Sequence, residues 1–171
     1  VLEENKEKNK LNEILFIIII AVILSISSIF FIRFATVEGH SMDNTLNDGQ
    51  ILLIKVFNIH PERGDIITIE RPDLSIRFLI KRVIAVEGDI IEIKNNILYL
   101  NGEAIKENYI KEPMYTEDYP AKTIPEGKVF VMGDNRNVSM DSRSNVIGLV
   151  DEKEVLGKAV FSISDFKFID E

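Results

Sequence analysis

Residues 76–86 read IRFLIKRVIAV, an apolar run interrupted only by charged residues, of which Lys81 and Arg82 stand side by side in its middle. The run is rich in β-branched residues, and turn residues flank it at 72–73 and 88–89, which is typical of a strand. Successive side chains of a strand point to opposite faces, so one member of this pair points to the apolar side. Burial disfavours the charged form of a lysine and lowers its pKa, which makes Lys81 a candidate base.

Shorter runs of the same kind lie on both sides of this strand, at residues 50–56, 65–70, 90–93, 97–100, 129–132 and 158–163. The dipeptides Asn95-Asn96 and Asn101-Gly102 predict tight turns, because these residue types tolerate a positive φ. Residues 109–127 contain three prolines and indicate an irregular connection. The part of the chain after residue 35 is therefore predicted to be mostly β, a β-barrel or sheet-rich domain folded on itself.

The N-terminal part is different. Residues 14–32 read ILFIIIIAVILSISSIFFI, without charge, proline or glycine. As a helix this run spans about 28 Å, close to the roughly 30 Å hydrocarbon core of a bilayer, and it predicts one transmembrane helix. Three lysines precede it, whereas Arg33 alone follows closely. The positive-inside rule then places the N-terminus in the cytoplasm and the later domain outside.

These patterns divide the chain into a cytoplasmic segment, 1–13, a transmembrane anchor, 14–34, and an extracytoplasmic domain, 35–171. The net charge is −8 and basic residues do not cluster, which argues against nucleic acid as a partner. The chain has no cysteine, so disulfides and thiolate metal sites are excluded. The acidic loop near residue 134 lacks the alternating ligand spacing of a calcium loop, and no metal is expected.

Two polar segments stand out from the β pattern: residues 37–46, VEGHSMDNTL, and residues 133–143, GDNRNVSMDSR. Taken alone, each is also compatible with a solvated turn. Together with a lysine in an apolar strand, however, Ser41 of the first segment suggests serine activation by lysine in place of histidine.

The segments also resemble, in order, the conserved boxes of the type I signal peptidases, the membrane-bound Ser–Lys leader peptidases that remove signal peptides from exported proteins. The similar stretches are Ser41-Met42-x-x-Thr45-Leu46, Arg63-Gly64-Asp65-Ile66, Lys81-Arg82-Val83-Ile84 with Gly88-Asp89, and the second polar segment. A single anchor is similar to the shorter, Gram-positive-like members.

The resemblance implies a serine endopeptidase with Ser41 as nucleophile and Lys81 as general base. It further implies that Ser139 hydrogen-bonds the lysine and that Asp141 and Arg143 form a supporting salt bridge. Gly39 and Met42 flank the nucleophile and complete the expected site. The implied partners are signal-peptide-bearing preproteins and the lipid bilayer of the plasma membrane, and no cofactor is implied.

Two positions depart from the family pattern. Asn44 occupies a place where the family usually has proline, which leaves the loop after Ser41 less constrained. Gly39 occupies a place where some members have a serine whose hydroxyl helps to bind the oxyanion. The oxyanion would then be bound mainly by the backbone N–H of Ser41.

Three other interpretations explain the sequence less well. His40 neighbours Ser41, but adjacent side chains of an extended loop face apart, which disfavours a histidine-based triad. A self-cleaving Ser–Lys peptidase of the repressor type would be soluble and would carry a DNA-binding part. The apolar run at 14–32 and the acidic net charge both argue against it. A membrane-tethered, non-catalytic β domain that binds envelope partners would explain the anchor and the sheet, but not the combination of Ser41, Lys81 and the polar loop.

Overall fold

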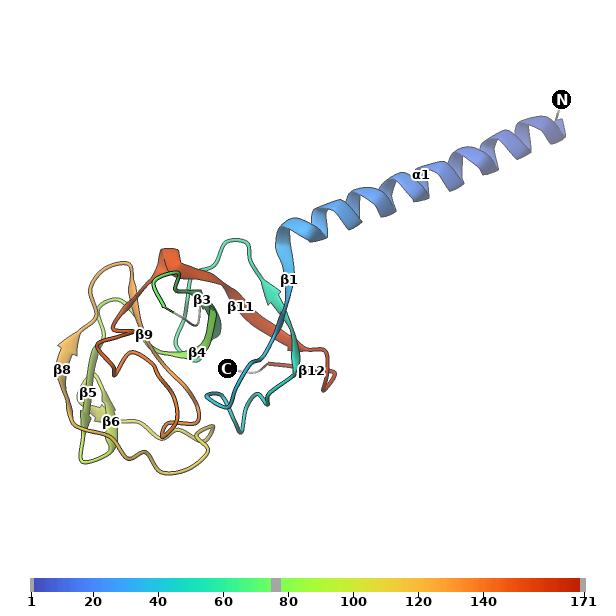
Figure 1. Ribbon diagram of the computed structural model, residues 1–171. Coiled ribbons are helices and arrows are strands. Elements are labelled where there is room, and N and C mark those ends of the chain that lie inside the picture. Colours follow the sequence, from blue (N-terminus) through green and yellow to red (C-terminus); the bar gives the residue numbers. More distant parts are fainter. Residues whose placement is uncertain (1, 75–77, 170–171) are drawn as a thin grey trace.

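The computed structural model describes residues 2–74 and 78–169, with the side chains of residues 2–9, 11 and 26–30 left aside. A single long helix, α1 (Leu2–Phe31), extends away from a body made of two β-sheets (Figure 1). Its described large apolar side chains are exposed, from 40% for Phe31 to 64% for Leu24. Within the described ranges, no helix combines the length and apolar composition that crossing a bilayer requires.

The helix ends at Phe31, where the N–H of Val56 donates a hydrogen bond to the Phe31 carbonyl (3.0 Å). The rings of Phe31 and Phe57 meet edge to face, with centroids 5.0 Å apart. Residues 32–34, which the sequence assigned to the anchor, belong instead to strand β1 (Ile32–Thr36), because they pair with the strand that follows.

The larger sheet has eight strands in the order β1-β2-β11-β3-β4-β9-β10, and β12 pairs with β11. All its recorded pairings are antiparallel. Besides β1, its strands are β2 (Ile51–Lys55), β3 (Ile66–Glu70), β4 (Phe78–Ala85), β9 (Lys128–Met132), β10 (Val150–Asp151), β11 (Val155–Ser162) and β12 (Lys167–Phe168); a 3-10 turn, η1 (Glu152–Glu154), precedes β11. Among the described strands, β1 and β10 end the order without pairing with each other, so the sheet is open rather than a closed barrel.

The smaller sheet has the order β7-β6-β5-β8, with β5 (Ile90–Lys94), β6 (Ile97–Leu100), β7 (Glu103–Ala104) and β8 (Tyr119–Thr123). The predicted irregular connection at 109–127 therefore contains a strand. Pro120 lies in that strand, and β8 is an edge strand, the position at which a sheet tolerates proline.

The strands and turns predicted around residues 50–56, 65–70, 90–100 and 129–132 are confirmed within one or two residues. Asn95 and Asn96 have φ values of 52° and 64°, and Asn101 and Gly102 have values of 54° and 85°, as tight hairpin turns require. The predicted strand at 76–86 corresponds to β4, which is described from Phe78 onwards. Residues 76 and 77 lie outside the described part of the chain.

Strand β4 lies where three groups of buried apolar side chains meet. Leu79 and Val83 pack with β3 and β9, Ile84 packs against the smaller sheet, and Ile80 packs against the group that contains Met42. Any polar side chain in the middle of β4 is therefore enclosed by core, which positions the site described next.

Candidate active site

Ser41 and Lys81, separated by forty positions in the chain, meet in the structure: Lys81 Nζ donates a hydrogen bond to Ser41 Oγ (2.8 Å) and another to the Ile80 carbonyl (2.9 Å). Ser41 begins a tight turn after β1, closed by the Leu46 N–H bonding to the Met42 carbonyl (2.8 Å). The serine therefore comes from a loop and the lysine from a rigid central strand.

Lys81 is only 3% exposed. Burial lowers the pKa of its ammonium from 10.5 to about 8, against the opposing effect of the nearby Asp141 and Asp134 carboxylates. A substantial fraction of the lysine is then neutral near physiological pH, with a lone pair available to Ser41 Oγ. This arrangement has the geometry and the proton affinity that a general base needs.

Arg82 points to the opposite face of β4 and is also buried, at 2% exposure, so both cations of the pair lie inside the domain. Its guanidinium donates to both carboxylate oxygens of Asp134 (2.9 and 2.8 Å) and to the Gly64 carbonyl (2.8 Å). Asp134 also accepts a hydrogen bond from Thr45 Oγ1 (2.5 Å). The ion pair thus connects the strand that carries Lys81 to the loop that carries Ser41.

Tyr109 covers this ion pair. The Arg82 guanidinium lies 4.1 Å from the centroid of the Tyr109 ring, and the Tyr109 hydroxyl donates to Glu107 (2.6 Å). Glu107 in turn accepts two hydrogen bonds from Arg136 (2.6 and 2.5 Å). Burial raises the pKa of Tyr109 above its ordinary range, so the hydroxyl remains a donor.

The second polar segment, residues 133–143, clamps the loop that carries Ser41. The Asn135 N–H donates to the Ser41 carbonyl (3.0 Å), and the Asn135 side-chain amide donates to the His40 carbonyl (2.9 Å). Gly133 permits this close approach, because a Cβ built there would overlap the Ser41 carbonyl oxygen and the Ser139 side chain. The backbone on both sides of the Ser41 side chain is therefore fixed from outside its own turn.

Asp141 and Arg143 form the salt bridge that the family resemblance implies, with Nε to Oδ1 at 2.8 Å. Asp141 also accepts a hydrogen bond from the Gly133 N–H (3.0 Å), which holds the clamp in place. Ser139 Oγ is buried and has no hydrogen-bond partner in the described part of the chain. The expected hydrogen bond between Ser139 and Lys81 is thus not formed in this structure.

The remaining expected site residues, Gly39 and Met42, shape and support the loop around Ser41. Gly39 has a φ of +85° and its N–H donates to Asp48 Oδ1 (2.7 Å). Met42 is 1% exposed and belongs to the core beneath the loop. Asn44 has a φ of 87°, a conformation that proline, fixed near −65°, cannot adopt. The loop after Ser41 therefore has a backbone that the family's usual proline would forbid.

In the described part of the chain, the His40 ring is hydrogen-bonded to Asp43 and not to Ser41 Oγ. Its ring is 69% exposed, and Nδ1 lies 3.3 Å from Asp43 Oδ1. Asp43 is paired on its other oxygen with Lys111 Nζ (2.9 Å), and this hydrogen bond lowers the pKa of Asp43. The geometry favours Lys81 over His40 as the base for Ser41.

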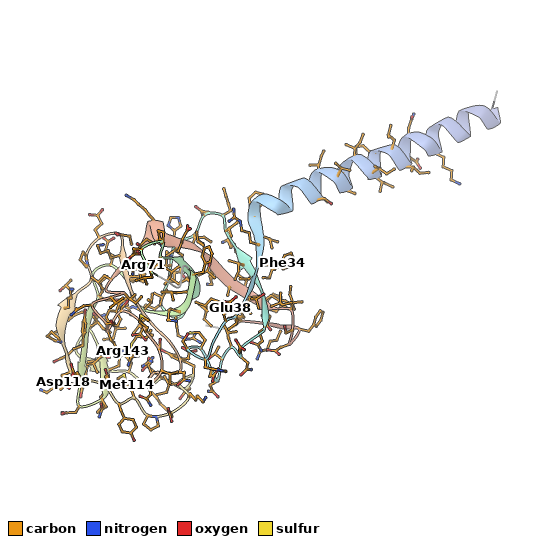
Figure 2. All side chains as sticks on the ribbon, viewed as in Figure 1. Phe34, Glu38, Arg71, Met114, Asp118 and Arg143 are labelled. Atoms are coloured by element: carbon orange, nitrogen blue, oxygen red, sulfur yellow. The ribbon has the colours of Figure 1, made fainter. Side chains whose placement is uncertain are left out.

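Ser41 and Lys81 line a groove of about 980 Å³. Among its lining residues, Phe34 lies near the base of α1 and Glu38 lies closer to the body of the domain (Figure 2). Its apolar lining includes Phe34, Val37, Met42, Ile54, Ile80, Val138, Met140 and Leu156. An extended peptide with small or apolar side chains fits such a surface.

Sequence reasoning gave no role to several residues that build this site. The partnership of Arg82 with Asp134, the clamp by Asn135 and the cover by Tyr109 were not anticipated. One signal was present: a cation inside an apolar strand needs a buried anion, and Asp134 directly follows an apolar strand. Tyr109 lies in a segment without periodic pattern, and nothing in the sequence singled it out.

Comparison with known proteins gives concordant matches. The family model described as "Signal peptidase, peptidase S26" matches residues 10–164. Signal peptidase I of Bacillus licheniformis is 39% identical over 180 residues, which cover 98% of this chain and 96% of that protein. Signal peptidase IB of Staphylococcus aureus is 34% identical over 185 residues, which cover 95% of each.

A crystal structure of a signal peptidase I from Enterococcus faecalis aligns with a TM-score of 0.50 and 33% identity, and covers 58% of this chain and 97% of that one. These matches confirm the resemblance drawn from the sequence, and with it the enzyme class, a signal peptidase I and serine hydrolase. The chain belongs to the signal peptidase family, peptidase S26.

Proposed function

We propose that the protein removes N-terminal signal peptides from exported preproteins, with Ser41 as nucleophile and Lys81 as general base. The observation that carries this proposal is the 2.8 Å contact between Lys81 Nζ and Ser41 Oγ in a groove with a largely apolar lining. The relatives named signal peptidase I support the same substrate class.

The reaction is amide hydrolysis through an acyl-enzyme. Neutral Lys81 accepts the Ser41 proton while Oγ attacks the scissile carbonyl, and the backbone N–H of Ser41 is the proposed donor to the oxyanion. Protonated Lys81 then gives its proton to the leaving amine. A water that donates its proton to neutral Lys81 attacks the ester carbonyl. Protonated Lys81 then returns this proton to Ser41 Oγ as the ester bond breaks, and the signal peptide leaves with a free carboxylate.

We further propose that the N-terminal segment anchors the enzyme in the plasma membrane, with the N-terminus in the cytoplasm and the β domain outside. The uncharged run at 14–32, the lysines before it and the exposed apolar side chains of α1 support this arrangement. Enzyme and signal peptide would then share one membrane, which raises their effective concentration.

The full-length protein in detergent is expected to cleave a preprotein directly after a small-x-small sequence, the selectivity that the family resemblance implies. N-terminal sequencing of the product locates the cut. The matched control is the same preprotein with tryptophan in place of the last residue before the cleavage point, which should remain intact. A folded enzyme that cleaves neither preprotein would favour the alternative of a tethered, non-catalytic β domain.

The pH dependence of kcat/KM should show whether Lys81 is the general base. Only neutral Lys81 can accept the serine proton, so the rate should rise with pH through about 8 and level off above it. A histidine base would instead place the rise near pH 6.5. Initial rates on a peptide substrate between pH 6 and 10 distinguish the two (roughly one decade of rate per pH unit on the acid side). A profile that is flat from pH 6.5 to 9 would exclude Lys81 as the base.

A further inference from the structure

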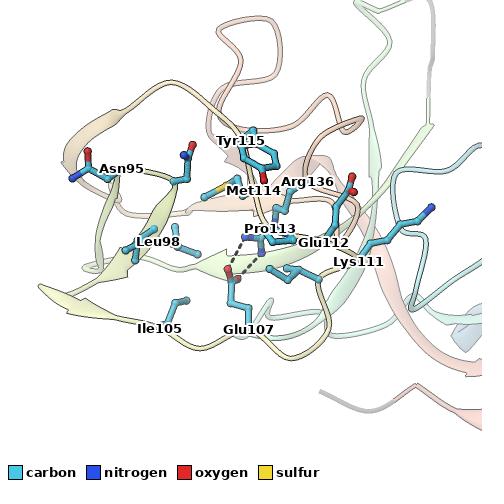
Figure 3. A pocket seen from close by; sticks show the side chains of 13 residues that line it. Asn95, Leu98, Ile105, Glu107, Lys111, Glu112, Pro113, Met114, Tyr115 and Arg136 are labelled. Atoms are coloured by element: carbon cyan, nitrogen blue, oxygen red, sulfur yellow. Dashed lines mark hydrogen bonds and ion pairs between the residues drawn. The ribbon is translucent and has the colours of Figure 1, made fainter.

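Resting on the proposed function, we infer that a second groove binds the first residues of the mature chain, those that follow the cleavage point. This groove has a volume of about 600 Å³ and lies between the β5–β6 turn and the segment 105–115 (Figure 3). It is separate from the groove that contains Ser41 and Lys81, and the two share no lining residue.

The surface of this groove suits an extended peptide without negative charge. Its floor is apolar, with Leu98 and Met114 only 2% and 4% exposed. Its rim carries exposed side chains, both apolar or aromatic (Tyr115 at 73%, Ile97 at 45%) and polar (Asn95, Asn96, Lys111 and Glu112). The charge of Arg136, which lies among the lining residues, is neutralised by the two hydrogen bonds to Glu107 shown in Figure 3. An apolar floor with polar groups at the rim is the usual composition of a peptide-binding groove.

The direction of the substrate follows from the first groove. That groove is lined by Arg33 and Phe34, beside the end of α1, as well as by Ser41. A signal peptide is apolar and would come from the membrane that holds the anchor, so it enters from this side. The chain after the scissile bond must therefore leave in the direction away from α1, and Figure 2 shows Met114 farther from α1 than Phe34 and Glu38.

The second groove begins at that exit. Lys111, which lines it, is paired with Asp43 (2.9 Å), two residues after the nucleophile. The Asn44 side chain donates to the Tyr109 carbonyl (3.3 Å), so the segment that forms one wall of the groove rests directly on the nucleophile loop. A peptide that crosses Ser41 thus meets the second groove without leaving the surface. Lys111 already has an anionic partner and Glu112 adds a carboxylate to the rim, so the groove favours residues without negative charge.

Two substrates test this assignment. They share one sequence through the cleavage point; one ends shortly after it, and the other continues for about ten residues, roughly 33 Å of extended chain. The wild-type protein is expected to cleave the long substrate with a kcat/KM about tenfold higher, mainly through a lower KM, because contacts far from the scissile bond add uniform binding.

The variants Tyr115→Ala and Ile97→Ala should abolish most of this length dependence and leave cleavage of the short substrate unchanged. Val146→Ala, an exposed valine (53%) outside both grooves, is the matched control and should retain the full dependence. Equal rates for both substrates, or a dependence that survives both rim variants, would overturn the inference and leave the groove to another occupant, such as a second copy of the chain. Failure of the wild type to cleave either substrate would overturn the proposed function itself.

Discussion

Replacing Lys81 by methionine is expected to lower kcat/KM on a signal-peptide substrate by on the order of 10⁴-fold or more, as happens when one member of a nucleophile–base unit is removed. Ser41→Ala should have an effect of the same size, because the two side chains act as one unit at 2.8 Å. The double variant should then be no worse than either single one. Cleavage kinetics of all three proteins with one substrate measure this non-additivity.

Lys81→Arg is the control that separates charge from proton transfer. Arginine keeps a cation near Ser41 but stays protonated at any accessible pH, so it cannot act as a base and should be as inactive as methionine. Lys81→Met should also be no less stable than wild type at pH 7, because it removes a buried ionisable group whose pKa burial has lowered. Turnover of Lys81→Met or Lys81→Arg at the normal rate would remove Lys81 from the proposed mechanism.

The burial of Lys81 could be predicted from the sequence, because the residues next to it in the chain are enough to indicate it. Lys81 interrupts an apolar run, and a strand in such a run must bury one of two successive side chains. The inference was incomplete in one respect: both Lys81 and Arg82 are buried, since β4 has core on both faces. Strands buried on both faces show no alternation, and the sequence alone does not reveal which partners compensate them.

The contacts that fix Ser41 could not be predicted in the same way. Asn135 and Gly133 act on the nucleophile loop across more than ninety residues of chain, through backbone groups that leave no compositional pattern. The family resemblance identified their segment but not what they bind. Strand β8 was missed for a different reason: Pro120 argues against a strand in general, and only its edge position in the sheet makes it compatible.

Arg82→Met is expected to lower the free energy of unfolding by about 3–5 kcal/mol, the usual cost of leaving one member of a buried ion pair without its partner. The Arg82 and Asp134 side chains are 2% and 0% exposed, so water cannot replace the lost guanidinium. The Lys128–Asp151 pair is the matched control: it has the same 2.8 Å separation, but its side chains are 33% and 52% exposed. Lys128→Met should therefore cost less than about 1 kcal/mol. Urea unfolding of the full-length variants in one detergent compares them.

Replacing both members of the Arg82–Asp134 pair shows whether the pair contributes to stability alone or also to the position of Ser41. With Arg82→Met and Asp134→Leu combined, no charge remains unpaired, and most of the lost stability should return. Activity should not return with it, because Asp134 also accepts the hydrogen bond from Thr45, four residues after Ser41. A double variant that is both stable and fully active would mean that the ion pair has no part in positioning the nucleophile loop. A stable but slow one would show that the fold tolerates an apolar pair here, whereas the alignment of Ser41 with Lys81 depends on the polar one.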